Sequence, residues 1–137
     1  MVTKLSAHFA LEELTASQTA ARFDLNNTPT KAALAALTDA AARMEVVRNL
    51  LGNKVITISS GYRSPAVNKK VRGVPTSAHV SGHAIDFNCY GYGDPKAICA
   101  TLAAADRKVL PFDQLIEEGT WVHISFAPAM RRQVLTK

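Results

Sequence analysis

The longest regular pattern in the chain is a run of apolar residues at helical spacing between Thr30 and Gly52. Thr30 is a suitable residue to cap the amino-terminal end of a helix, and Gly52 is a suitable residue to end it. The pattern predicts one long helix whose apolar face packs into a core. The residues that recur at steps of three and four are Leu34, Leu37, Ala41, Met44, Val47 and Leu51.

Shorter helices and strands surround this helix. Residues 9–23 predict short helical pieces, with Thr15 or Ser17 as a cap, and residues 95–109 predict a helix that opens with Pro95. Helices come first, and strands interrupted by one helix then close in a hairpin, which predicts an α+β fold rather than a regular βαβ alternation. Strands are predicted by β-branched and alternating segments at 54–64, 83–90, 112–118 and 121–128.

Size and composition limit the class of protein. The chain has 137 residues, 47% of them hydrophobic, and shows no internal repeat or linker, so we expect one domain over residues 1–137. No apolar run approaches the roughly 20 residues of a membrane span. The first residues do not resemble a secretory signal. Cys89 and Cys99 do not form a zinc-finger or disulfide pattern, and we expect reduced thiols.

The net charge of +5 suggests an anionic partner. The densest basic cluster is Lys69, Lys70 and Arg72, and Arg131 and Arg132 form a second pair near the end. A nucleic-acid binder would show a reading helix or aromatics interleaved in a basic stripe, and neither is evident. Anionic cell-wall polymers fit the charge equally well, and duplex DNA is left as a weaker alternative.

Three potential metal ligands lie in the second half of the chain. His79 and Asp86 are seven residues apart, with Gly82 allowing a turn between them, and His123 lies inside the last predicted strand. Two imidazoles and one carboxylate are a suitable donor set for a catalytic zinc ion, which takes three protein ligands and keeps a fourth position open. The residues therefore predict a metal site, provided that the fold brings His123 to the other two.

The residues alone leave a second interpretation open. In it, His79 and His83 are solvated loop residues and His123 packs under Trp121. Strand alternation places Trp121, His123 and Ser125 on one side of the strand, with aliphatic residues on the other, so that side faces water or a cleft.

Three segments resemble the M15 family of zinc peptidases. The sequence SAHVSGHAID over residues 77–86 is similar to the family signature Ser-x-His-x-x-Gly-x-Ala-x-Asp. Residues 59–68 resemble the family's Ser-Gly-Tyr-Arg-Ser segment. Residues 112–126 resemble the closing Trp-x-His strand of the phage-type branch, which the opening of the chain also resembles. The resemblance covers nearly the whole chain and implies an M15 or hedgehog-like fold, with helices on one face of a small, mostly antiparallel sheet that carries a zinc site.

The resemblance also implies roles for individual residues. Arg63 matches the arginine that binds substrate and stabilises the developing oxyanion, and Ser77 matches a residue that lines the substrate cleft. His83 falls at a variable position, and we expect it to be a solvent-facing neighbour. The implied Zn²⁺ ligands are His79, Asp86 and His123.

The general base is harder to place. Some branches of the family carry an acid or a histidine three positions before the last ligand, where this chain has Thr120. Phage-type relatives look like Asp-Gln-Leu-Ile-x-Glu here, which favours Glu118 over Glu117 as the base. Alternation predicts two sets of residues on opposite faces of the strand, namely Gln114, Ile116 and Glu118 on one and Asp113, Leu115 and Glu117 on the other.

These residues together predict a zinc-dependent hydrolase that cuts a peptide bond in the stem peptide of peptidoglycan. The resemblance implies a phage endolysin, related to D-Ala-D-Ala carboxypeptidases or L-alanyl-D-glutamate endopeptidases, and we expect a monomer. We expect synthesis in the host cytoplasm and action on the wall or periplasm after release, with no nucleic-acid partner and no stable membrane insertion. The alternative is a zinc-containing wall-binding or virion structural module without catalysis.

Overall fold

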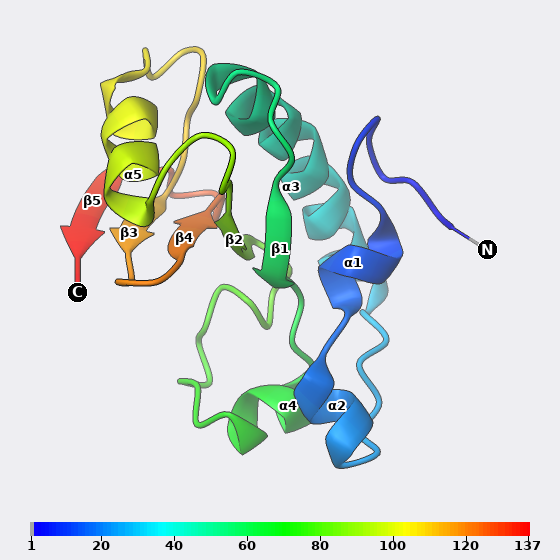
Figure 1. Cartoon of the computed structure of the whole chain (residues 1–137). Helices are drawn as coiled ribbons and strands as arrows, with labels where there is room; N and C mark the ends of the chain where they lie inside the picture. Colours follow the sequence, from blue (N-terminus) through cyan, green and yellow to red (C-terminus); the bar gives the residue numbers. More distant parts are fainter. Residues whose placement is uncertain (1) are drawn as a thin grey trace.

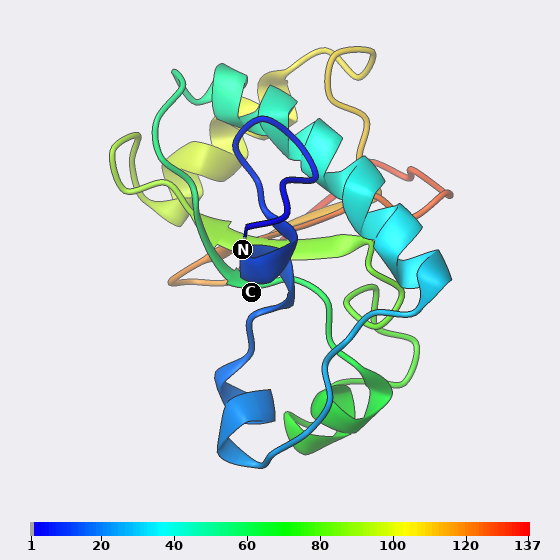
Figure 2. The ribbon, with the colours of Figure 1, turned by 90° about the vertical axis from the view of Figure 1, so that its right-hand side faces the viewer.

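Two long helices cover one face of a five-stranded sheet in the computed structural model, which describes residues 2–137. These helices are α3 (Lys31–Leu50) and α5 (Pro95–Ala104). Figure 2 shows both on the same side of the sheet, which is seen nearly edge-on. The α+β fold predicted from the sequence is thereby confirmed. Among the described residues, no helix combines the length and the apolar character that a bilayer span requires.

Three short helices flank these layers: α1 (Leu11–Thr15), α2 (Gln18–Arg22) and α4 (Pro65–Lys70). In Figure 1, α2 and α4 lie together below the sheet. The caps follow the sequence, because Ser17 accepts a hydrogen bond from the third residue of α2 and Thr30 does the same for α3. Helix α4 was not predicted, although Ser64 caps it and Pro65 opens it. Helix α5 begins at Pro95 as expected and ends at Ala104, five residues early.

The sheet has the strand order β1-β2-β4-β3-β5. All pairs are antiparallel except β3 with β5, which are parallel. The predicted closing hairpin is the β3–β4 pair, but β5 then adds one more, exposed strand that the sequence did not indicate. The strands are β1 (Thr57–Ser60), β2 (Ala84–Asn88), β3 (Gln114–Glu117), β4 (Val122–Ser125) and β5 (Gln133–Thr136).

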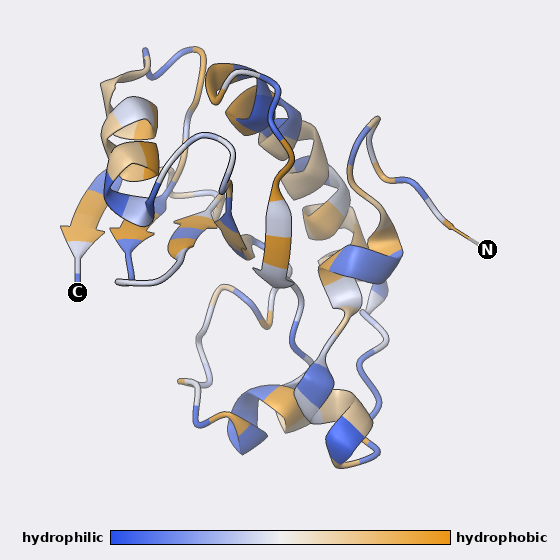
Figure 3. Ribbon diagram, viewed as in Figure 1, coloured by the Kyte–Doolittle hydropathy of each residue, from blue (hydrophilic) through white to orange (hydrophobic). Residues whose placement is uncertain are grey.

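The two faces of the sheet differ in character. Aliphatic and aromatic side chains of β2, β3 and β4 are fully buried against the helices, and Figure 3 shows apolar and polar stretches next to one another along the strands. The polar residues between them face the other way, where neither α3 nor α5 lies. The buried set from the strands is Ile85, Phe87, Leu115, Val122 and Ile124, and it meets Leu37, Met44 and Val47 of α3.

Candidate metal centre

The open face of the sheet brings the three predicted ligands together. Asp86 on β2 and His123 on β4 are directly opposite in the antiparallel pair, and His123 Nδ1 lies 2.8 Å from Asp86 Oδ1. His79 approaches from the preceding loop, with Nε2 at 3.3 Å from the same oxygen. One potential ligand atom from each residue lies within 4.8 Å of the other two. The structure therefore realises the grouping that spacing and resemblance predicted.

A backbone carbonyl fixes the orientation of His79. The Nδ1 atom lies 2.7 Å from the carbonyl oxygen of Gly61, at the end of β1, and a carbonyl can only accept a hydrogen bond. Nδ1 is therefore the protonated nitrogen of the neutral ring, and the Nε2 lone pair is directed to the centre. Such a partner is the usual means of orienting a histidine ligand.

Gly82 shapes the loop between the first two ligands. Its φ is +83°, a conformation that residues with a side chain rarely adopt. A Cβ atom there would also lie 2.5 Å from the carbonyl oxygen of Ala33 in α3. Both observations explain why the loop requires glycine at the point where it passes α3 on its way to β2.

The charges of the site favour a bound cation. Burial alone would raise the pKa of Asp86, but the interactions with His123 and His79 outweigh it and bring the pKa to about 2. Asp86 is thus an anion at neutral pH. Burial lowers the pKa of Arg63, partly offset by the negative charge of Asp86, and a guanidinium remains charged in any case.

The donor set fits Zn²⁺. Two imidazole nitrogens and one carboxylate oxygen are typical ligands of catalytic zinc, and the three side chains are only 3%, 15% and 12% exposed for His79, Asp86 and His123. Their cluster lines a cleft of about 620 Å³, so a fourth coordination position would face the cleft. An ion held there is accessible to a substrate.

Arg63 and Ser77 line the same cleft. The Nη2 group of Arg63 donates to Ser77 Oγ over 3.3 Å, and the backbone N–H of Arg63 donates to the carbonyl of His79. The buried Nε of Arg63 has no hydrogen-bond partner among residues 2–137. An unpaired buried donor is costly, so this edge of the guanidinium is suited to receive an acceptor from a ligand.

The two candidate bases lie on opposite faces of the sheet. Glu118 lines the cleft, and its Oε1 lies 3.4 Å from Lys137 Nζ. Glu117 lies on the side of α5, where burial first and the carboxylate of Glu117 second raise the pKa of the Cys99 thiol to about 11. Of the two glutamates, only Glu118 shares the cleft with the ligands.

The alternation of faces along the strand predicted the wrong side for Asp113, a near neighbour of these glutamates. It predicted Asp113 on the same face as Leu115 and Glu117, but Asp113 lines the cleft on the other side and pairs with Arg131. The reason is that regular pairing in β3 begins only at Gln114, so the alternating pattern does not extend back to Asp113.

The remaining histidines lie outside the metal group. His83, expected to be a solvent-facing neighbour, is half-buried and pairs with Ser81, its Nδ1 lying 2.7 Å from Ser81 Oγ. His8, which had no evident partner in the sequence, lies 2.7 Å from Glu45 of α3. Neither ring is positioned with the cluster.

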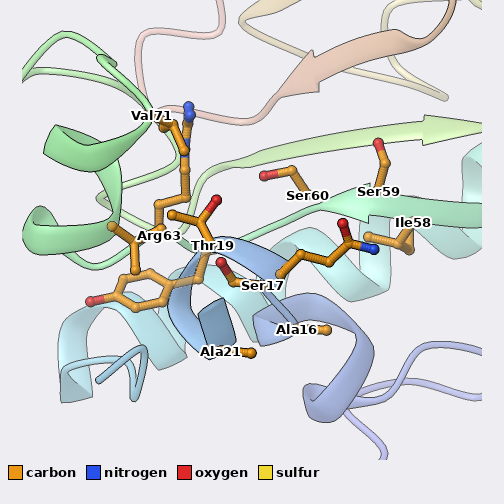
Figure 4. A pocket seen from close by; sticks show the side chains of 12 residues that line it. Ala16, Ser17, Thr19, Ala21, Ile58, Ser59, Ser60, Arg63 and Val71 are labelled. Carbon is orange, nitrogen blue, oxygen red and sulfur yellow. The ribbon is translucent and has the colours of Figure 1, made fainter. Parts of the chain in front are cut away.

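A second hollow of about 730 Å³ lies on the other side of Arg63, between α2, α4 and β1. Figure 4 shows hydroxyl side chains around it, among them Ser17, Thr19, Ser59 and Ser60. Because Arg63 lines both hollows, it forms part of the wall between them.

Sequence reasoning missed three charged residues of the cleft that holds the three potential ligands: Asp113, Arg131 and Lys137. In the sequence, the pair of arginines at 131 and 132 indicated only a local concentration of positive charge. Its place depends on the turn that leads from β4 into β5, and β5 itself is exposed and short. No pattern in the residues marked that turn as part of a site.

The chain belongs to the M15 peptidase family. The family model "Peptidase M15" matches residues 7–125, which span the three ligands and both candidate bases. A curated relative, the zinc D-Ala-D-Ala carboxypeptidase of Streptomyces albus G, is 35% identical over 63 residues. That match covers 46% of this chain and 23% of the relative. The resemblance noted in the sequence is confirmed at the level of the family.

Proposed function

We propose that the protein is a zinc-dependent peptidase that cleaves a peptide bond in the stem peptide of peptidoglycan. The observation that carries this proposal is the single cleft that holds three potential zinc ligands, a carboxylate on its wall and a half-buried arginine. These are the groups that metal-assisted hydrolysis of an amide requires. The relative from Streptomyces albus G, whose name includes zinc and D-Ala-D-Ala, supports the metal and the class of substrate.

Each residue has a role in this chemistry. When bound by His79, Asp86 and His123, zinc would supply Lewis acidity that makes water a better nucleophile and polarises the scissile carbonyl. Glu118 takes the proton of the attacking water and delivers it to the leaving amine. Arg63 donates hydrogen bonds to the oxygen that becomes negative in the transition state, and Ser77 holds its Nη2 group.

The biological setting is part of the proposal. The protein is a monomeric endolysin in this proposal, and the resemblance of its opening and closing segments to phage-type members of the family supports the phage origin. Such an enzyme is made in the host cytoplasm and acts on the wall after release. The net charge of +5 is favourable for approach to an anionic wall.

Digestion of purified sacculi with zinc supplied tests the function directly. The decisive pair of variants is Glu118→Gln and Glu117→Gln, which make the same chemical change at adjacent residues, of which only Glu118 lines the cleft. We expect the first to lower the rate by about 10²- to 10⁴-fold, as for the loss of a general base, and the second to retain it. Masses of the released fragments distinguish cleavage of L-Ala–D-Glu from removal of terminal D-Ala.

Two other outcomes would contradict the proposal. If the wild-type protein sediments with sacculi but releases no fragment, it is a wall-binding module and the enzymatic function is wrong. If Glu117→Gln abolishes release while Glu118→Gln does not, the assignment of the base is wrong.

A further inference from the structure

The cleft contains a fixed cation that the proposed chemistry does not use. Arg131 lines the same cleft as the three potential ligands, and its side chain is 55% exposed. It precedes β5 on the β3 side of the sheet, whereas Arg63 follows β1 at the opposite edge. The metal group therefore lies between two arginines.

Asp113 holds Arg131 in place by three hydrogen bonds. The Nε and Nη2 groups of Arg131 donate to the two carboxylate oxygens over 2.8 Å and 2.9 Å, and its backbone N–H donates over 3.0 Å. Asp113 is itself only 5% exposed. A bidentate pair of this kind fixes the plane of the guanidinium as well as its position.

The backbone around Arg131 supports the same geometry. Met130 and Arg132, on either side, have φ values of +44° and +56°, which are unusual for residues with side chains. The guanidinium of Arg132 anchors the segment by donating to the carbonyl of Leu110 and stacking over the ring of Phe112. Arg131 is thus presented on a built turn and is not a freely moving surface side chain.

Part of the guanidinium remains available. It carries five N–H groups, of which Asp113 takes two, and among residues 2–137 no other acceptor meets the side chain. The free Nη1 edge can bind a second planar carboxylate in the way that arginine binds the first.

The charge of the whole cleft favours an anionic ligand once the metal is bound. Three cations, Arg63, Arg131 and Lys137, balance three carboxylates on its walls. The carboxylates are those of Asp86, Asp113 and Glu118. A divalent ion would therefore leave a surplus of two positive charges in the cleft, which a peptide with carboxylates of its own would neutralise.

We propose that Arg131, held by Asp113, binds a carboxylate of the substrate and so makes the enzyme selective for acidic peptides. This inference rests on the proposed peptidase function. It assigns Arg131 the role of a specificity-determining residue, distinct from the role of Arg63 in the transition state.

The experiment compares two peptides that differ in one group. Stem peptides are prepared with a free carboxylate or with a carboxamide at the same residue next to the scissile bond. Equilibrium binding to the protein and steady-state cleavage are both measured, for wild type, Arg131→Gln and Arg131→Lys. Because Arg131→Gln leaves Asp113 as an unpaired buried charge, the double variant Asp113→Asn/Arg131→Gln is included to keep the region neutral. The matched control is Arg43→Gln, which breaks an Arg–Asp pair on α3 away from the cleft.

We expect the wild type to prefer the carboxylate peptide by about tenfold in KM, as for one charged hydrogen-bonded pair. Arg131→Gln and the double variant should lose this preference through a higher KM for the carboxylate peptide, with kcat and the carboxamide peptide little changed. Arg131→Lys should keep part of it, and Arg43→Gln all of it.

The role of Arg131 is refuted if the double variant still prefers the carboxylate peptide, or if the wild type shows no preference. In either case, cleavage of the peptides would still support the peptidase function. Selective binding without cleavage does the reverse, because it supports the role of Arg131 and refutes the peptidase function.

Discussion

Gly61 couples the packing of α1 to the metal centre, and replacing it by alanine tests that coupling. A Cβ atom at this position would lie 2.2 Å from the carbonyl oxygen of Leu14 in α1, a distance that real Cβ atoms do not tolerate. The same carbonyl accepts the N–H of Tyr62 over 2.8 Å. The carbonyl of Gly61 itself holds His79 Nδ1 at 2.7 Å. Gly61→Ala must therefore move α1 away or move the end of β1, and the second movement displaces the partner of His79.

The magnitude follows from these contacts. Overpacking costs about 1–3 kcal/mol, and loss of the hydrogen bond between Tyr62 and Leu14 costs about 0.5–1.5 kcal/mol. We expect Gly61→Ala to lower the free energy of unfolding by about 2–4 kcal/mol in total, since both effects arise from the same displacement. Loss of the partner that orients a metal-binding histidine typically lowers metal affinity by about 10- to 100-fold.

Two assays separate these effects. Urea unfolding followed by circular dichroism gives the stability, and competition with a chromogenic chelator gives the affinity for zinc. Gly91→Ala is the matched control, because a Cβ there would meet only the side chain of Lys54 at 3.7 Å, an ordinary contact. If Gly61→Ala unfolds like the wild type, the crowding argument is refuted. If it is destabilised but binds zinc as tightly as Gly91→Ala, the coupling to His79 is refuted.

Three further measurements test the site and its surroundings. Zinc at about 100 times its Kd should stabilise the wild type by about 2.7 kcal/mol, a rise of roughly 10 °C in Tm that chelation reverses and that His123→Ala lacks; an equal rise in that variant would contradict the ligand assignment. Hydrogen bonds from Arg131 lower the pKa of Asp113, so its ionised form stabilises the fold above the unfolded pKa of about 4 and this contribution is lost as the pH falls through the lower folded pKa. The stability difference between wild type and Asp113→Asn, measured by urea unfolding, should therefore be present at pH 7 and shrink below about pH 4, and a constant difference would refute the pairing. Burial and Glu117 raise the pKa of Cys99 to about 11, so iodoacetamide at pH 8 should label the native protein far more slowly than the unfolded protein, as mass spectrometry would show; equal labelling would place Cys99 outside the core.

Local patterns in the sequence were sufficient for the parts of the fold that local interactions determine. The long apolar stripe from Thr30 predicted α3, and its cap lies where the hydroxyl of Thr30 suggested. Alternation in β4 predicted which side of the strand carries His123. Alternation could not show that His79 and Asp86 share a site with His123, about forty positions further along the chain. The resemblance to the M15 family indicated this grouping.

Features that depend on tertiary structure were missed. Strand β5 is exposed along its length and shows no alternation of buried and exposed residues, so no periodic signal marks it. Arg131 owes its place to the turn before β5 and to Asp113, which stands just outside the regular part of β3. Two partners that are distant in sequence and lie on irregular backbone leave no local pattern.

The sheet that forms the core also assembles the metal centre. Val122 and Ile124 flank His123 in β4, and both are fully buried against the helices. A shift of one residue between β2 and β4 would expose this pair and turn His123 toward the core. Burial of each aliphatic side chain contributes about 1.5–3 kcal/mol, so such a shift is opposed by roughly 3–6 kcal/mol from β4 alone. The register that pairs Asp86 with His123 is therefore maintained by apolar packing on the opposite face of the sheet.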